Sequence, residues 1–282
     1  MTLSDVAAMQ NVGSMYLGVC LPTFVGSVDA VTEMATRAEQ VGLDGLFAFD
    51  HLLGSGGRVA SRPAMELTVA MSQAIATTST IRVGSLVARA GLRPPAMMAH
   101  QFNTLDRISG GRVIAGLGFG DAQSRTEYEV LGLRPTPHAE RLAWMRLTAT
   151  LLGDRGIPVW IGASSLEGRR LAAEVGGWNA WAAAPDTIAR VATEFDADRV
   201  RVNISWAGSV LVRPDAGAAQ ALWAQRSDKE AIIWGDPSRI ADQLRVRQAA
   251  GARWGIVALV EPCAGSIEML GEVRSLLRRR AR

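Results

Sequence analysis

The chain has little of several features that mark whole classes of protein. Only two cysteines, Cys20 and Cys263, occur in 282 residues, and no Cys-x-x-Cys pair is present. Two such thiols cannot build a disulfide framework or a cysteine-rich metal site, so we expect both to be buried free thiols. No apolar run is long enough for a membrane span, and residues 1–15 lack the basic start and apolar stretch of a signal peptide. These absences predict a cytoplasmic protein.

Histidine and lysine are also scarce. The three histidines, His51, His100 and His138, lie far apart, and no HExxH, GxSxG or P-loop motif is present. A multi-histidine metal centre is therefore not expected, nor is a serine-hydrolase or P-loop site. The net charge is +3, but Lys229 is the only lysine, and the arginines are scattered among acids except at 278–282. A helix end that complements its own dipole explains that cluster, so neither nucleic acid nor a membrane is an expected partner.

What the chain does have is an alternation of buried strands and amphipathic helices. The stretch 81–121 shows the unit: an apolar, β-branched strand, a helix opened by proline and stopped by Ser-Gly-Gly, and a second strand rich in glycine. Two parallel strands joined by one helix make a βαβ unit. The expected strands lie near 17–21, 45–49, 81–86, 112–117, 158–162, 178–181, 200–205 and 255–260.

Helical spacing of apolar residues fills the segments between these strands. The expected helices cover 28–41, 63–78, 94–109, 124–132, 137–152, 165–175, 185–195, 215–229, 236–250 and 264–279, and residues 1–14 form a loose leader. Eight strand–helix repeats in 282 residues favour a closed α/β barrel, the (β/α)8 TIM barrel, with residues 1–282 as one domain. A doubly wound open sheet stays possible, since periodicity alone does not separate the two.

Polar and glycine residues gather where the strands end, which is the usual place for a ligand in such folds. Asp50 and His51 directly follow the strand 45–49, and His51 is the only histidine so placed. An imidazole at this rim can move protons near neutral pH, or it can simply pack and hydrogen-bond at the strand end.

Two further stretches at strand ends each allow two interpretations. Residues 116–120 have the spacing GxGxG rather than the dinucleotide-binding GxGxxG, so their glycines serve either a tight turn or the close approach of backbone to a ligand. Ser164 followed by Glu167 predicts a capping box at the start of the helix 165–175. The same helix start is also a ready site for a phosphate, whose charge would offset two arginines in the first turns.

An ordered set of segments resembles the bacterial luciferase-like, flavin- or deazaflavin-dependent oxidoreductases. LDRISGGR at 105–112 and GGWNAW at 176–181 are its most specific members. The other segments are 42–53, 78–87, 93–99, 116–120 with Glu127 and Leu131-Gly132 downstream, 158–162 and 235–244. The resemblance implies a (β/α) barrel that binds FMN or the deazaflavin coenzyme F420 at the carboxyl ends of its strands. The GGWNAW form is more similar to the deazaflavin branch.

This resemblance implies an enzyme, an oxidoreductase that transfers a hydride between coenzyme F420 and a small organic substrate. One alternative is an FMN-dependent monooxygenase of the same family. Another is a protein that binds the cofactor without turnover, because a fold does not guarantee chemistry. Relatives often pair through barrel helices, so a homodimer is also implied.

The resemblance assigns site residues as well. It places catalytic roles on His51 and Asp50, beside the cofactor ring. The implied cofactor-binding residues at the face of the ring are Ser85 and Leu86, in some members of the family through a non-proline cis peptide. Those along the cofactor's tail are Phe119, Gly120 and Asp121, and those at its phosphate are Gly162, Ala163, Ser164 and Ser165. Trp181 is implied as a wall of the pocket. Several relatives have glutamate where this chain has Asp121, so a catalytic role for that shorter acid is left open.

Overall fold

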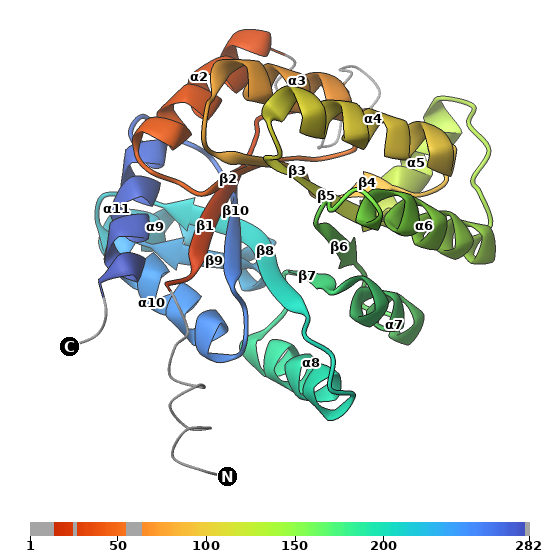
Figure 1. The fold of residues 1–282 in the computed structure, drawn as a ribbon. Helices are drawn as coiled ribbons and strands as arrows, with labels where there is room; N and C mark the ends of the chain where they lie inside the picture. The colour runs from red at the N-terminus through yellow and green to blue at the C-terminus, as the bar shows by residue number, and fades with distance from the viewer. Residues whose placement is uncertain (1–13, 25–26, 55–63, 280–282) are drawn as a thin grey trace.

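The fold is a closed barrel of parallel strands wrapped by helices (Figure 1). The structure, a computed structural model, describes residues 14–24, 27–54 and 64–279, so nearly all of the expected leader lies outside it. The barrel strands are β1 (Tyr16–Cys20), β2 (Gly45–Ala48), β3 (Arg82–Ser85), β5 (Val113–Gly118), β6 (Val159–Gly162), β7 (Gly177–Trp181), β8 (Asn203–Val212) and β10 (Trp254–Leu259).

Neighbouring barrel strands pair in parallel throughout, in the order β10-β1-β2-β3-β5-β6-β7-β8. The pairing of β10 with β8, from Trp254 opposite Ser205 to Leu259 opposite Val210, closes the ring. The predicted (β/α)8 barrel is therefore confirmed, and the open sheet is excluded.

The helices lie outside this ring and begin and end where the sequence provides caps. They are α2 (Val28–Gln40), α3 (Leu67–Thr77), α4 (Pro95–Ser109), α5 (Ala122–Val130), α6 (His138–Gly153), α7 (Leu166–Val175), α8 (Pro185–Ala197), α9 (Ala216–Ala224), α10 (Pro237–Ala249) and α11 (Ser266–Arg278). In α2, for example, the Ser27 hydroxyl accepts from the Ala30 N–H, and α4 ends at Gly110 with φ of 70°. Figure 1 shows α2, α3 and α4 side by side along one side of the barrel. No helix in the described ranges is long and apolar enough to cross a membrane.

Three features of the sheet differ from the prediction. Strand β8 runs to Val212 rather than ending at 205: one of its edges pairs with β7 as far as Ala207, the other pairs with β10 as far as Val210, and its second half extends past β7. That second half pairs with an unpredicted strand, β9 (Ile232–Gly235), which follows a short 3₁₀ turn, η2 (Lys229–Ala231). A two-residue strand, β4 (Ala88–Arg89), pairs with β5 above the end of β3.

The barrel interior is filled by an aromatic cluster near the amino ends of the strands. Phe47 and Trp160 stack at 5.7 Å between ring centroids, and Trp254 meets both rings edge-on. Room for Phe47 comes from glycine on three strands: a Cβ added at Gly18, Gly45 or Gly84 would lie 2.7 Å from its ring. This packing closes one end of the barrel, so the interior is a core rather than a channel.

The larger apolar core lies between the strands and the surrounding helices. It includes Leu17 and Val19 on β1, Ala35 and Ala38 on α2, and Phe102 on α4, all nearly or fully inaccessible to solvent. Burial of these side chains on both faces of the parallel sheet explains why the strands have no polar alternation in sequence.

Candidate functional site

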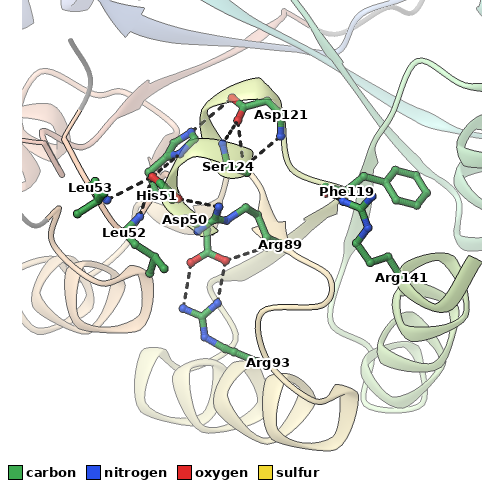
Figure 2. Close-up of polar contacts among 11 residues, drawn as sticks. Asp50, His51, Leu52, Leu53, Arg89, Arg93, Phe119, Asp121, Ser124 and Arg141 are labelled. Atoms are coloured by element: carbon green, nitrogen blue, oxygen red, sulfur yellow. Dashed lines mark hydrogen bonds and ion pairs between the residues drawn. The ribbon is translucent and has the colours of Figure 1, made fainter. Parts of the chain in front are cut away.

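His51 lies at the carboxyl-terminal rim of the barrel, just after β2, with its ring between two carboxylates. Its Nδ1 is 3.1 Å from Oε1 of Glu127, and its Nε2 is 3.6 Å from Oδ2 of Asp121. Only 14% of the His51 side chain is exposed, and the Phe24 ring packs 5.7 Å from the imidazole, centroid to centroid. Figure 2 shows the ring directed toward Asp121. The imidazole is thus held in one place and still reaches the rim.

Glu127 on α5 has no exposed side-chain surface and ties several elements together at this point. Its Oε1 accepts hydrogen bonds from the N–H groups of Leu52 and Leu53, at 3.1 and 3.2 Å. Its Oε2 lies 2.7 Å from Nη1 of Arg89, whose side chain is also buried, so the two charges form an ion pair. A buried carboxylate needs such partners, because desolvation otherwise disfavours its charge.

Asp50, the residue before His51, points away from the imidazole. Its carboxylate accepts two hydrogen bonds from Arg93, at 2.8 and 2.9 Å, and a third from the Arg89 N–H at 2.8 Å (Figure 2). Arg93 also pairs with Glu66. Burial opposes the charge on Arg93, but its bonds to these two acids prevail and raise its pKa. Asp50 therefore lies in a buried ion pair that anchors the start of α4, and its catalytic role stays a prediction.

Asp121 serves as the N-cap of α5 while it faces His51. Its Oδ1 accepts from the Ser124 N–H at 3.0 Å, and the Ser124 hydroxyl lies 3.1 Å from the Asp121 N–H, which completes a capping box. Partial burial acts to raise the pKa of Asp121, but the Ser124 N–H and the nearby His51 outweigh it, so the pKa is lowered. The side chain is 61% exposed, which makes it the solvent-facing acid of the pair around His51.

The ring-face residues predicted at the end of β3 surround a cis peptide bond. This bond joins Leu86 to Val87, and neither residue is proline. The buried Ser85 hydroxyl donates to the Gly116 carbonyl at 2.7 Å, and Leu86 packs among the interior side chains. Ser85 has no exposed surface, and its side chain ties β3 to β5, so its role at a ring face stays a prediction.

Val87 explains the glycines that follow. A Cβ added at Gly118 would lie 2.3 Å from Val87 Cγ2, and one at Gly162 would lie 3.0 Å from Val87 Cγ1. At Gly116 an added Cβ would lie 2.2 Å from the Ser85 carbonyl oxygen. Close packing against Ser85 and Val87, a reason that the sequence did not suggest, accounts for Gly116 and Gly118, and the predicted turn, with φ of 83°, accounts for Gly120.

Phe119 lies in the loop between β5 and α5, within a cluster that the sequence did not reveal. Its ring stacks on His138 with centroids 4.7 Å apart and planes 13° from parallel. Arg141 donates to the Phe119 carbonyl at 2.5 Å, as Figure 2 shows. His138, which looked ordinary in the sequence, is thus part of the rim, 3.9 Å from the Glu167 carboxylate.

The predicted phosphate residues lie together where β6 leads into α7. Ser165 is the N-cap, and its hydroxyl accepts from the Gly168 N–H at 3.2 Å. The predicted capping box of Ser164 with Glu167 is therefore wrong by one position, because Ser165 and not Ser164 occupies the N-cap. Ser164 and Ser165 are exposed, and Gly162 and Ala163 are half-buried. Arg169 donates to the Ser164 carbonyl and pairs with Glu194, so its charge is already balanced.

Aromatic side chains form the wall on the β7 side. Trp181, the last residue of β7, is 50% exposed and meets the Phe49 ring edge-on at 5.8 Å. Phe49 in turn stacks on Phe24 at 5.6 Å. Together they form an apolar surface that leads from β7 to His51, which suits a flat ligand.

The two cysteines lie apart and differ in exposure. Cys20 is buried in the barrel interior, and burial raises the pKa of its thiol. Cys263 is exposed, so the prediction that both thiols are buried is wrong for Cys263. It lies in the loop before α11, with its Sγ 3.4 Å from the Ser266 hydroxyl. Among the residues that the structure describes, no three His, Cys, Asp or Glu side chains gather as a metal site.

The structure thus brings His51 and Asp121 together and places Phe119, Gly120, Trp181 and the β6–α7 residues around the same rim. Sequence reasoning missed the contacts of Glu127, Arg89, Arg93, His138 and Arg141. For Glu127, its position among the segments that resemble the family could have indicated a role at the site.

Comparison with known proteins shows what the chain is similar to. Residues 15–152 match the sequence model of the family described as luciferase-like monooxygenase, which confirms the resemblance found in the sequence. The F420-dependent glucose-6-phosphate dehydrogenase of Amycolatopsis mediterranei is 34% identical over 126 residues, which are 44% of this chain and 36% of that protein. The pyrimidine monooxygenase RutA of Methylorubrum populi is 31% identical over 151 residues, 52% of this chain and 38% of that protein. These matches span little more than a third of the relatives' length.

Solved structures match the fold over almost the whole chain. An F420-dependent secondary alcohol dehydrogenase, in complex with an F420–acetone adduct, superposes with a TM-score of 0.74 at 18% identity and covers 95% of this chain and 99% of that one. The oxygenating constituent of 3,6-diketocamphane monooxygenase from Pseudomonas putida, in complex with FMN, gives a TM-score of 0.70 at 14% identity, over 95% and 98%. At such identities the likeness concerns the fold alone.

Proposed function

We propose, starting from this family match, that the chain is a coenzyme F420-dependent oxidoreductase acting on a small organic substrate. The observation that carries the proposal is His51, fixed at the carboxyl-terminal rim by the wholly buried Glu127 with its Nε2 toward the exposed Asp121. A histidine placed in this way can exchange a proton with a substrate, which hydride transfer from a carbon–oxygen or carbon–nitrogen bond requires.

The residues at the rim fit a deazaflavin or flavin group. Phe49 and Trp181 offer an apolar wall for a flat ring system. At the start of α7, the first-turn N–H groups have no partner within the helix, and Ser165 caps only that of Gly168. Gly162, Ala163 and the exposed Ser164 and Ser165 would hold a phosphate there.

Each rim residue has a separate task in this proposal. The bound coenzyme supplies a ring carbon that accepts or gives a hydride. His51 takes the substrate's proton at Nε2 as the hydride leaves, and returns a proton in the reverse direction. Asp121, exposed and beside Nε2, lets that proton pass to solvent. Asp50 fixes the strand end from which His51 projects, through its bonds to Arg93.

The main alternative is an FMN-dependent monooxygenase, because the RutA proteins are as similar to this chain as the dehydrogenases are. A binding protein without turnover is the second alternative. The order of preference rests on the two F420-dependent dehydrogenases at 34% and 31% identity, together with the GGWNAW segment at 176–181.

The decisive experiment is titration of the purified chain with coenzyme F420 and with FMN, followed by turnover assays with alcohol and sugar-phosphate substrates. We expect tighter binding of coenzyme F420 and reduction of it at the expense of a substrate. His51→Asn should lower turnover by about 10²–10⁴-fold and leave the coenzyme dissociation constant within a few-fold. Tighter FMN binding with oxygen-dependent turnover would favour the monooxygenase instead. Binding without any turnover would favour the second alternative, a protein that binds the cofactor without catalysis.

The phosphate site has its own test in Ser164→Asp. Because Ser164 is exposed and Ser165 provides the cap, this change adds negative charge without removing a capping hydroxyl. We expect weaker coenzyme binding with little change in the thermal stability of the free protein. Ser227→Asp is the matched control: it adds the same charge at an exposed serine in the segment between α9 and β9, outside the β6–α7 segment. Equal affinity in both variants would reject the site.

We further propose that the protein is cytoplasmic, consists of a single domain, and forms a homodimer through its outer helices. Exposed apolar side chains such as Val69 on α3 and Met97 and Ile108 on α4 could form such an interface. A monomer mass by light scattering across micromolar concentrations would remove the dimer from the proposal.

A further inference from the structure

We infer that Glu127 is a positioning residue that keeps the proton of neutral His51 on Nδ1, so that Nε2 is the atom that exchanges protons. The inference rests on the proposed function for its consequence, but its structural part can be tested without turnover. It concerns a side chain with no exposed surface, which can act on a substrate only through His51.

The Glu127 carboxylate has only the capacity to accept. Its Oε1 already accepts from two backbone N–H groups, those of Leu52 and Leu53, and its Oε2 lies 2.7 Å from the Arg89 guanidinium. Two N–H donors and an adjacent cation stabilise the ionised form of a buried acid. An ionised carboxylate has no proton to donate, so the ring nitrogen 3.1 Å from Oε1 must carry the hydrogen.

Among the residues that the structure describes, the other ring nitrogen has no comparable partner. Asp121 Oδ2 lies 3.6 Å from Nε2, which is longer than a hydrogen bond. The Asp121 side chain is also 61% exposed, and its Oδ1 is engaged by Ser124. In a neutral imidazole the hydrogen bond made by one nitrogen decides which nitrogen is protonated. Nδ1–H directed at Glu127 therefore leaves the Nε2 lone pair free toward the rim.

This arrangement serves proton transfer in two ways. Nε2 needs no rearrangement before it accepts a proton from a substrate. The imidazolium that results then has a buried carboxylate on Nδ1, which stabilises its charge in the manner of the aspartate in a serine-protease triad. Arg89 has the further task of balancing the buried negative charge of Glu127.

The first test is the tautomer of His51, read from ¹⁵N chemical shifts of the imidazole at a pH where the ring is neutral. The chain has only three histidines, so His100→Gln and His138→Gln variants assign the signals by elimination. We expect the Nδ1–H form for His51 in the protein without any ligand. A predominant Nε2–H form would overturn the inference.

The second test removes the acceptor. In Glu127→Gln the ring loses the negative charge next to Nδ1, so the preference for the Nδ1–H form should weaken and the Nε2–H form should become populated. The control is Glu129→Gln, two residues along α5, where the side chain is exposed. If Glu127→Gln does not fold, Arg89→Met/Glu127→Met removes both charges of the pair and should likewise lose the Nδ1–H form. An unchanged tautomer in either folded variant would overturn the inference.

The kinetic consequence separates this inference from the proposed function. Given turnover, Glu127→Gln should lower kcat by about 10²-fold or more with the coenzyme dissociation constant within a few-fold, while Glu129→Gln leaves both unchanged. The Nδ1–H form in a protein without turnover would support the positioning role and refute the proposed function. Turnover in a protein whose His51 has the Nε2–H form would support the proposed function and refute the positioning role.

Discussion

The packing of Val87 against glycine at the barrel mouth leads to a stringent prediction about stability. In Gly118→Ala the added methyl group would lie 2.3 Å from Val87 Cγ2. Ordinary contacts between carbon atoms are about 3.5–4.0 Å, so either Val87 or β5 must move. Truncating the obstacle, in Val87→Ala, should restore room for the methyl group.

The magnitudes follow from the same geometry. Overpacking of this kind costs about 1–3 kcal/mol of unfolding free energy. Val87→Ala alone removes part of a half-buried side chain and should cost about 1 kcal/mol, at about 0.8 kcal/mol for each fully buried methylene. In the double variant the new methyl group fills part of the vacated space, so its cost should stay near about 1 kcal/mol, close to that of Val87→Ala. The two changes should thus couple favourably by about 1–3 kcal/mol, within the range measured for residues in contact.

Urea denaturation of the four proteins at 25 °C measures this coupling, provided that the m-values agree. The control is Gly153→Ala at the end of α6, where an added Cβ meets no atom within 4 Å and φ is not positive. It should leave stability unchanged or raise it by about 0.4–1 kcal/mol. Single effects that add to within about 0.5 kcal/mol would refute the steric argument, because they would show that Val87 and position 118 do not compete for space.

Three other outcomes are expected. Arg93→Met should lower the unfolding free energy by about 3–5 kcal/mol in urea denaturation, because it leaves the Asp50 carboxylate buried without its cation. The double variant Asp50→Asn/Arg93→Met should recover part of that loss, and a cost under about 1 kcal/mol for Arg93→Met alone would contradict the buried pair. Ellman's reagent should titrate one thiol, Cys263, in the native protein and a second, Cys20, only after unfolding; two fast thiols would be inconsistent with burial of Cys20. The folded-state pKa of Asp121 is lowered, so its contribution is present above the unfolded value of about 3.9 and lost as the pH falls through the folded value. Asp121→Asn should therefore lower Tm at neutral pH, with a difference that shrinks as the pH falls below the unfolded pKa of about 3.9, and a constant difference would argue against a charge effect.

Most of the fold follows from local signals in the sequence. Runs such as those in β1 and β10 are apolar on both faces, and Gly or Pro marks the ends of most helices, so most strand and helix bounds agree with prediction to within a few residues. The helix predicted at 215–229 is an exception, because α9 ends at Ala224. Strand β9 was missed because Ile232–Gly235 is a four-residue run between two helices, too short to show a period. The second half of β8 was missed because Gly208 interrupts the apolar run, and only the structure shows that it makes room for the Trp206 ring.

The site was predictable in position and much less so in its contacts. Strand ends alone placed His51 at the rim. Which acid supports it depends on tertiary packing: α5 carries Glu127 and Glu129 two residues apart, and only the fold buries the first and exposes the second. The same limit applies to the cap of α7, where two adjacent serines, Ser164 and Ser165, are equivalent in sequence and the path of the chain selects the second.

The closure of the barrel has a consequence for biosynthesis. Strand β10 pairs with β1 on one side, at Tyr16 opposite Trp254, and with β8 on the other. A nascent chain that has emerged from the ribosome only as far as α10 therefore has two strands with unpaired edges, and such edges invite pairing with other chains. Its aromatic interior also lacks Trp254, one of the three rings that fill it. The rim that holds His51 is thus complete only when the residues of β10 have been synthesised, and protection of these edges until then falls to the cell's chaperones.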